Sequence, residues 1–236
     1  MKIGIITDIH NNSVALEAVL ARFSQENCDG VICCGDIIGI GPYPEETVKI
    51  VMNIPNLMTC VKGNHESYFV EGIHIEPNMS AEEAEHHKHM HILMSPSLKE
   101  FLCSLKFEEY LEVDGKKIYV AHYALDENNR FKRGTERPTL GQVQQLFSGI
   151  EADVILYGHR HTKSIFRDDK LYINCGSLGC PHSDSGIAKA GILVIDDKIT
   201  FTELEVQYDV VKVLADMDEM DYSGKDTIKK IFFGRG

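Results

Sequence analysis

The sequence predicts an α/β protein in which two sheets pack face to face, with helices on the outside. Three observations lead to this prediction. The first 62 residues alternate short apolar runs with amphipathic segments, which is typical of parallel strands joined by helices. The second half of the chain contains pairs of strand-like runs joined at short turns rich in Asp and Gly. The stretch 66–107 interrupts both patterns and is expected to be a small helical insertion.

In the first half, strands are expected at 2–7, 30–35 and 57–62, and helices at about 13–23 and 45–53. The strand-like runs are mostly apolar without alternation, as expected of strands that a parallel sheet buries on both faces. The order strand, helix, strand, helix, strand implies parallel pairing with right-handed crossovers.

In the insertion, Ser80 is a plausible N-cap because Glu83 follows three residues later, and a second helix is expected to begin near Ser95. Hairpins are expected in the second half, and one helix near 139–149. The expected strands are 108–114, 117–122, 154–158, 164–168, 171–175, 190–196 and 199–205. The tail 208–236 is expected to begin as a helix, and no role is predicted for its apolar end.

The composition is that of an ordinary globular protein, with 236 residues, 43% hydrophobic and 25% charged, and one domain over 1–236 is expected. A net charge of −12 argues against a stable complex with nucleic acid. No segment resembles a membrane span or a leader peptide, so no membrane partner and a cytoplasmic location are expected. In that compartment the seven cysteines would be thiols, although Cys175 and Cys180 lie close enough in sequence to form a bridge. The formation of an oligomer is possible on this sequence.

Polar side chains of metal-ligand type follow five of the apolar runs, at the point where each run ends. They are Asp8 and His10, Asp36, Asn64 and His65, His122, and His159 and His161. Open α/β sheets bind their ligands at the carboxyl ends of strands. One such cluster alone would be read as a cap or a surface feature, whereas five in series predict a shared metal site.

The residue types indicate which metals fit. In an extended chain residues i and i+2 point the same way, so Asp8 and His10 can bind one ion together. Imidazole and carboxylate ligands favour transition metals over magnesium or calcium. Manganese is expected, with iron, zinc, nickel and cobalt as alternatives.

Asp36 has two oxygens and is the expected bridge between two divalent ions. Such a pair can hold a hydroxide for in-line attack on phosphorus, and His65 is the expected proton donor to the leaving oxygen.

The complete set of motifs resembles the calcineurin-like metallophosphoesterase superfamily. The motifs are Asp8-x-His10, Gly35-Asp36, Gly63-Asn64-His65-Glu66, His122 and Gly158-His159-x-His161. Two further segments, Asn174-Cys-Gly-Ser-Leu-Gly179 and Gly39-x-Gly41-Pro42, resemble its bacterial branch of small phosphodiesterases and diadenosine tetraphosphate hydrolase-like proteins. The resemblance covers about residues 1–205. It implies a four-layer αββα sandwich of two mixed sheets with outer helices.

The resemblance also implies roles for single residues. One metal is held by Asp8, His10, Asp36 and His161, and the other by Asp36, Asn64, His122 and His159. Asn64 and His65 would act on the substrate phosphate. Tyr123 stands where relatives often have Gly, and Cys175 where Pro is common. Tyr123 is expected to narrow the space beside the second metal.

Several polar residues allow two interpretations. His86, His87, His89 and His91 are interpreted as a solvated helix face or a cap over the active site, since no carboxylate or cysteine obviously completes a metal set. No third ligand cluster is therefore expected. His74 has no evident partner, while His182 is expected nearer the site.

Gly176 and Ser177 either bind a substrate phosphate through backbone N–H groups or form a tight turn that needs glycine. Arg130, with Lys132 and Arg133, lies either in a solvated loop or beside an anionic substrate.

The sequence therefore predicts a two-metal phosphoesterase that hydrolyses a phosphodiester or a nucleotide phosphoanhydride, with a small phosphoester or nucleotide as its substrate. One alternative is a phosphomonoesterase of the same fold. Few cations lie inside the motifs, namely Lys62 and Arg160, which favours diesters. The other alternative is a catalytically silent metal-binding scaffold. The presence of His65 and Asp36 argues against it.

Overall fold

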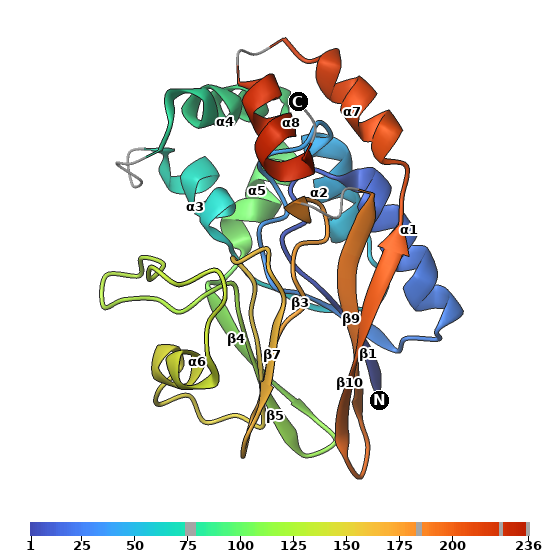
Figure 1. The fold of residues 1–236 in the computed structure, drawn as a ribbon, viewed down its shortest axis with the longest axis vertical. Helices are drawn as coiled ribbons and strands as arrows, with labels where there is room; N and C mark the ends of the chain where they lie inside the picture. The colour runs from blue at the N-terminus through green and yellow to red at the C-terminus, as the bar shows by residue number, and fades with distance from the viewer. Residues whose placement is uncertain (74–78, 183–185, 222–223, 235–236) are drawn as a thin grey trace.

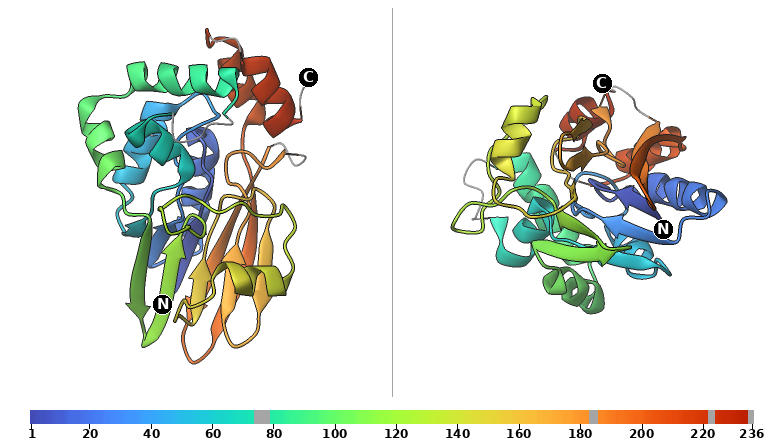
Figure 2. Two further views of the ribbon diagram at one scale, coloured as in Figure 1. Left: turned by 90° about the vertical axis from the view of Figure 1, so that its left-hand side faces the viewer. Right: turned by 90° about the horizontal axis from the view of Figure 1, so that it is seen from below.

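The computed structural model describes residues 1–73, 79–182, 186–221 and 224–234. Two five-stranded sheets pack against each other and helices cover their outer faces (Figures 1 and 2). The core between the sheets joins strands of both, with Ile5 and Ile32 from one sheet and Val120 and Leu156 from the other. The predicted sandwich of two mixed sheets with outer helices is confirmed.

The first sheet has the strand order β10-β9-β1-β2-β3. Its parallel strands are β1 (Lys2–Ile6), β2 (Gly30–Cys33) and β3 (Leu57–Cys60). The hairpin of β9 (Ile187–Ile195) and β10 (Ile199–Gln207) pairs antiparallel with β1. The predicted parallel unit is therefore correct, and the C-terminal hairpin extends the N-terminal sheet.

The second sheet has the order β4-β5-β6-β8-β7, with β5, β6 and β8 parallel. Its strands are β4 (Glu108–Val113), β5 (Lys116–Ala121), β6 (Val154–Leu156), β7 (Ser164–Arg167) and β8 (Leu171–Asn174). The carboxyl ends of the parallel strands in both sheets point toward the same end of the molecule, at the top of Figure 1. The predicted site residues follow these ends.

Three helices form the outer layers. Helices α1 (Ser13–Gln25) and α2 (Pro44–Met52) bury Leu16, Val19 and Val48 in the core against the first sheet. Helix α6 (Leu140–Leu146) packs Val143 against the outer face of the second sheet (Figure 2).

The insertion forms three helices, α3 (Asn64–Glu71), α4 (Ala81–Leu93) and α5 (Pro96–Ser104). Ser80 caps α4 as predicted, since its side chain accepts a hydrogen bond from the Glu83 N–H at 3.1 Å. The first helix begins earlier than expected, at Asn64, so two predicted site residues lie in a first helical turn. His74 lies outside the described residues.

The tail forms two helices, α7 (Val210–Asp218) and α8 (Lys225–Phe233). The end without a predicted role is thus a helix, in which Phe233 is buried beside Ile40 and Cys180. Helix α8 lies next to α4 (Figure 1), and a Cβ atom on Gly224 would approach Glu82 to 2.6 Å.

All seven cysteines are free thiols, so the Cys175–Cys180 bridge is not formed. In the part of the chain that the structure describes, every helix is too short or too polar to traverse a lipid bilayer.

Candidate metal centre

The predicted ligands from both sheets converge on one place at the carboxyl ends of the strands. Side-chain donor atoms gather in two groups that could each hold an ion, with the atoms of a group within 4.8 Å of one another, and His10, Asp36 and His65 form a further such group that links the two. The first group is Asp8, His10 and His161, and the second is Asp36, His122 and His159. Residues up to 153 positions apart in the chain, Asp8 and His161, are thereby brought together, as the strand-end pattern predicts.

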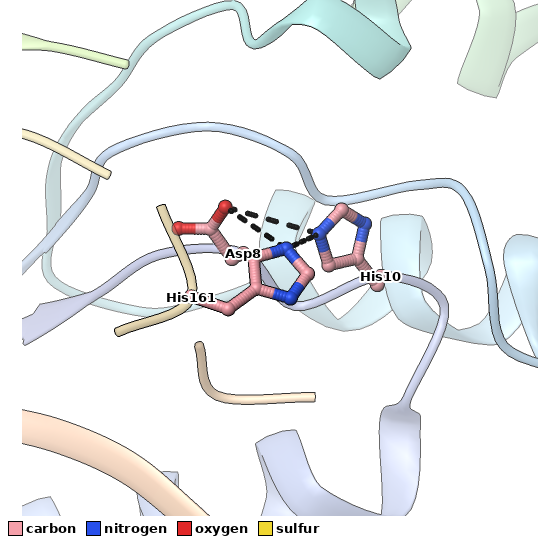
Figure 3. Close-up of side chains that lie close together, drawn as sticks. All are labelled: Asp8, His10 and His161. Carbon is pink, nitrogen blue, oxygen red and sulfur yellow. Dashed lines mark hydrogen bonds and ion pairs between the residues drawn. The ribbon is translucent and has the colours of Figure 1, made fainter. Parts of the chain in front are cut away.

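In the first group, two imidazoles and one carboxylate face one another (Figure 3). The Nε2 atoms of His10 and His161 are 2.9 Å apart, and they lie 3.8 and 3.6 Å from Asp8 Oδ1. Three donor atoms directed at a common point form the arrangement that a transition-metal ion requires.

In the second group, Asn64 supplies an amide oxygen between two imidazoles. Its Oδ1 lies 3.1 Å from His122 Nε2 and 2.8 Å from His159 Nδ1. His122 Nε2 is also 3.2 Å from Asp36 Oδ2. The amide oxygen, the carboxylate and the imidazoles thus share one small volume.

Asp36 lies between the two groups. The same oxygen, Oδ2, is 3.2 Å from His122 Nε2 and 3.8 Å from His10 Nε2. Its other oxygen accepts a hydrogen bond from the His65 N–H at the start of α3. Burial opposes the charge of Asp36, but His122 and His65 outweigh burial and hold its pKa well below the usual range. Asp36 is therefore ionised and faces both groups.

The outer ring nitrogens of three histidines are fixed by backbone carbonyls. The Nδ1–H groups of His10, His122 and His161 donate to the carbonyl oxygens of Ile38, Cys34 and Cys180, at 3.2, 2.8 and 3.1 Å. A hydrogen bond at Nδ1 sets the tautomer and leaves the Nε2 lone pair directed inward. Backbone support of this kind is typical of metal-binding imidazoles.

The loops that carry these ligands have unusual backbone conformations. Asp8, His10, Asp36 and His159 have φ values of 52°, 52°, 50° and 71°, in the left-handed region that non-glycine residues rarely adopt. The Asp8 N–H donates to the carbonyl of Gly35, which ties the first two loops together. Such conformations persist where the surrounding structure imposes them, and they are common at functional sites.

Two motif glycines are required by close approach. A Cβ atom on Gly63 would lie 2.1 Å from Asp36 Oδ1, and one on Gly158 would lie 1.9 Å from Thr7 Oγ1. Both contacts are far inside van der Waals distance. The glycines therefore let the loops that carry Asn64 and His159 pack directly against the other ligand loops.

Glu66 joins two of the ligand loops by hydrogen bonds, a role that the sequence analysis missed. Its buried carboxylate accepts hydrogen bonds from the N–H groups of Asp36, Ile38 and Gly63 at 2.9, 3.0 and 2.8 Å. It thereby joins the Asp36 loop to the start of α3. The position of Glu66 directly after three motif residues could have indicated that it belongs to the site.

The prediction of a solvated histidine face on α4 is wrong for two of its members. His86 and His87 are buried, with 2% and 0% of their surface exposed, because α4 folds back over the site. The alternative, a cap over the site, agrees with a distance of 3.2 Å between His87 Nε2 and His65 Nδ1. The expectation that no carboxylate joins these histidines is also wrong, since Glu83 lies with His65 and His87 in a further group of donor atoms.

The predicted phosphate-binding role of Gly176 and Ser177 is not supported. The Gly176 N–H donates to Asn174 Oδ1, and the Ser177 N–H donates to the His161 carbonyl. The Ser177 hydroxyl is buried and donates to the Asp8 carbonyl. Gly176 has φ 82°, so the segment is the glycine turn of the other interpretation, and its donors support the ligand loops.

Arg130 lies exposed in the loop after β5, while its neighbours lie closer to the site. The Phe131 ring stacks on His159 with centroids 6.1 Å apart. Lys132 and Arg133 line a cavity of about 480 Å³ together with Arg160, the residue after His159. Arg130 does not line this cavity, whereas its cationic neighbours Lys132 and Arg133 do.

Aromatic side chains and a further histidine lie against the rings of two predicted ligands, His159 and His161. Tyr123 is buried with its ring 4.8 Å from that of His159, where it narrows the space as expected. His182 lies near the site as predicted, 5.1 Å from the His161 ring, and Phe232 of α8 lies 5.7 Å from the same ring. The tail thus contributes to the wall of the first group.

Comparisons with known proteins agree with this geometry. The profile of the calcineurin-like phosphoesterase superfamily domain matches residues 1–198. An uncharacterized protein of Methanocaldococcus jannaschii is 30% identical over 232 residues, covering 89% of each chain. A phosphodiesterase of the same organism is 26% identical over 206 residues, covering 84% of this chain and 95% of its own. The crystal structure of a metallophosphoesterase from Sphaerobacter thermophilus superposes with a TM-score of 0.77 at 23% identity, covering 98% of each chain.

Proposed function

Because the chain belongs to the calcineurin-like phosphoesterase superfamily, a family of metal-dependent phosphoric ester hydrolases, we propose that it hydrolyses a phosphodiester or a nucleotide phosphoanhydride at a centre of two divalent ions. The observation that carries the proposal is the position of Asp36. One carboxylate oxygen of this residue faces the imidazoles of both donor groups.

The donor set fits two ions of the transition-metal class. In the proposal Asp8, His10, Asp36 and His161 hold one ion, and Asp36, Asn64, His122 and His159 hold the other. His10 and His161 direct Nε2 atoms at each other from 2.9 Å, and Asp36 raises the pKa of buried His122 to about 10 against the effect of burial. A metal cation between His10 and His161, or between Asp36 and His122, would take the position of a proton shared by these ligands. Manganese remains our proposed metal, with iron, zinc, nickel and cobalt as alternatives.

The chemistry separates into the part of the ions and the part of the protein. When bound, two such ions activate a water for in-line attack and neutralise charge on the phosphoryl oxygens. Asn64 would also contact the substrate phosphate through its amide. His65, whose ring lies 4.9 Å from that of His10, would donate a proton to the leaving oxygen. Burial lowers the pKa of His65, and the anionic substrate would raise it again toward the range a proton donor needs.

The cations near the site favour diesters over monoesters. A monoester carries a second phosphate charge, which requires a further cation. Lys62 is buried with its ammonium 5.1 Å from the Phe107 ring centroid, and Arg160 pairs with Glu136 at 2.7 Å. Both cations inside the motifs are therefore already engaged. The name of the 26% identical relative, a phosphodiesterase, supports the same class.

A cavity that Arg160 lines, one residue after His159, supports a longer anionic substrate, although none of the metal-type ligands is among its lining residues. Its lining cations besides the engaged Arg160 are Lys132 and Arg133, and its volume of about 480 Å³ lies in the range of small-molecule sites. A nucleotide phosphoanhydride such as a dinucleoside polyphosphate could place its further phosphates there. The insertion and the tail also contribute residues near the site, so we propose that 1–236 forms one functional domain.

A direct comparison of substrates tests the proposal. The purified protein is loaded with Mn²⁺ and assayed on bis-p-nitrophenyl phosphate, p-nitrophenyl phosphate and diadenosine tetraphosphate at equal pH. We expect faster turnover of the diester or of the dinucleotide than of the monoester. A clear preference for p-nitrophenyl phosphate would instead establish a phosphomonoesterase, and no metal-dependent hydrolysis of any substrate would contradict the proposal.

A further inference from the structure

Helix α4 carries two metal-type side chains toward the predicted proton donor. Glu83 and His87 are one helical turn apart, so they lie on the same face of α4. That face meets His65 in the first turn of α3. Donor atoms of Glu83, His87 and His65 all lie within 4.8 Å of one another, and none of the three residues belongs to either of the two strand-end groups.

The distances within the group match the coordination of zinc. His65 Nδ1 and His87 Nε2 are 3.2 Å apart. Two nitrogens that each lie ~2.0–2.1 Å from a tetrahedral ion are separated by roughly 3.3–3.4 Å. One carboxylate and two imidazoles are also an established zinc ligand set, in which a water takes the fourth position. An N–H···N hydrogen bond would explain the nitrogen pair, but it gives no reason for a carboxylate to converge on it.

The surroundings of the group are those of a protected site. His65 and His87 are both buried, and their ring planes are nearly parallel, 19° apart, with centroids 5.2 Å apart. The Tyr68 ring packs edge-on against both, at 5.6 and 5.5 Å. Aromatic walls of this kind limit exchange with bulk water and strengthen the interaction of a cation with its ligands.

We propose that His65, Glu83 and His87 bind a third transition-metal ion, such as Zn²⁺, beside the two-ion centre. The third ion should bind more weakly than the other two. His87 Nδ1 is buried with no hydrogen-bond partner among the described residues, whereas His10, His122 and His161 have backbone carbonyls there. The loss of such support typically lowers metal affinity by about 10–100-fold. The third site therefore fills only when metal is in excess.

Occupation of this site would affect catalysis through His65. An ion on Nδ1 would occupy one ring nitrogen of the proposed proton donor and would fix the orientation of its ring. Excess metal should then inhibit turnover. This consequence rests on the proposed function, whereas the binding of the ion does not.

Metal counting tests the site without an activity measurement. The metal-free protein is titrated with Co²⁺ alone, and bound metal is measured by equilibrium dialysis together with the visible absorption of tetrahedral Co²⁺. We expect three equivalents in the wild type, the third about 10–100-fold weaker. Glu83→Gln should bind two. Glu82→Gln, an exposed neighbour on α4 with the same change of charge, should still bind three.

Several results would overturn the inference. Saturation of the wild type at two equivalents would do so, as would a third equivalent that Glu83→Gln retains. If Glu83→Gln does not fold, His87→Gln replaces it and should also bind two equivalents. Anomalous diffraction from wild-type crystals soaked in Co²⁺ gives an independent decision. A peak between α3 and α4 would support the site, and its absence would reject it.

An activity arm separates this inference from the proposed function. We expect excess Co²⁺ to inhibit the Co²⁺-loaded wild type and Glu82→Gln, and to have at most a tenth of that effect on Glu83→Gln. Hydrolysis together with only two bound equivalents would reject the third site and retain the function. Three bound equivalents without hydrolysis would support the third site and contradict the proposed function.

Discussion

The loops at the strand ends and the helical insertion both contribute histidines to one site, but they hold them differently. In the strand-end loops, backbone carbonyls fix the outer nitrogens of His10, His122 and His161. In the insertion, His87 is held by the packing of α4 and faces another imidazole. The first arrangement is built into local chain geometry and the second depends on tertiary packing. The strand-end loops should therefore determine whether the site binds metal and reacts, and the insertion should adjust it.

The largest expected effect is at Asp36, which faces both donor groups. Asp36→Asn removes the one carboxylate that can be shared, so we expect turnover to fall by at least about 10³-fold, equal to about 4 kcal/mol of transition-state stabilisation. Bound Mn²⁺ should fall by at least one equivalent. Kinetics and metal analysis on one sample measure both, with circular dichroism as the control for folding. Two tightly bound ions in an active variant would contradict the bridging role.

The stability of the insertion should depend on pH through His86. Burial lowers the pKa of His86 to about 4, so between pH 6.5 and 4 the unfolded chain binds more protons than the folded one. This contribution is fully present above pH 6.5 and is lost as the pH falls toward 4, by roughly 3 kcal/mol. Burial also lowers the pKa of His87, to about 3, so His87 adds to the loss in both the wild type and the variant. Thermal unfolding of the wild type and His86→Leu over this range measures the effect.

A matched variant on the same helix controls this experiment. His89→Gln alters a less buried histidine and should keep the pH dependence of the wild type. An equally steep loss of stability in His86→Leu would mean that other groups cause the acid sensitivity.

In the proposed mechanism, His65 contributes chemistry and is not needed as a ligand in the two-ion centre. His65→Ala should keep two ions and the fold, and lower turnover at least about tenfold, as expected for a missing proton donor. The loss should be greater for substrates with poor leaving groups than for p-nitrophenyl esters, since only poor leaving groups need the proton. Loss of one of the two ions, or unchanged turnover, would remove His65 from this role.

The smallest expected effect lies at the cavity lined by Lys132, Arg133 and Arg160. Arg133→Gln should raise the KM for diadenosine tetraphosphate by about three- to tenfold, through weaker attraction of the distal phosphates, and leave bis-p-nitrophenyl phosphate unaffected. Lys163→Gln provides the control, because Lys163 is half exposed and paired with Glu203. Equal effects of both variants would indicate general electrostatics instead of a binding cavity.

The same contrast explains what the sequence could predict. The parallel strands and the convergence of Asp8, Asp36 and His122 follow from apolar runs that end in polar residues, because parallel strands in a sheet place their ends together. The fold of the insertion over the site does not follow from any local pattern. The burial of His86 and His87 arises from packing between distant segments, and a helix with histidines on several faces has no periodicity that reveals it.

Two further differences have local causes that only coordinates reveal. Whether Gly176 and Ser177 face a ligand or the protein depends on which carbonyls lie opposite their N–H groups, and here these are Asn174 and His161. Glu66 was visible in its motif, but its three backbone partners come from two separate loops.

The most direct test of the account is anomalous diffraction from crystals of the wild-type protein grown with Mn²⁺ at a concentration that fills only the tight sites. We predict two peaks ~3.5–4 Å apart, as in two-metal phosphoesterase centres, with Asp36 between them and His161 and His159 on opposite sides. A single peak, or two peaks of which one lies away from Asp36, would contradict the central claim.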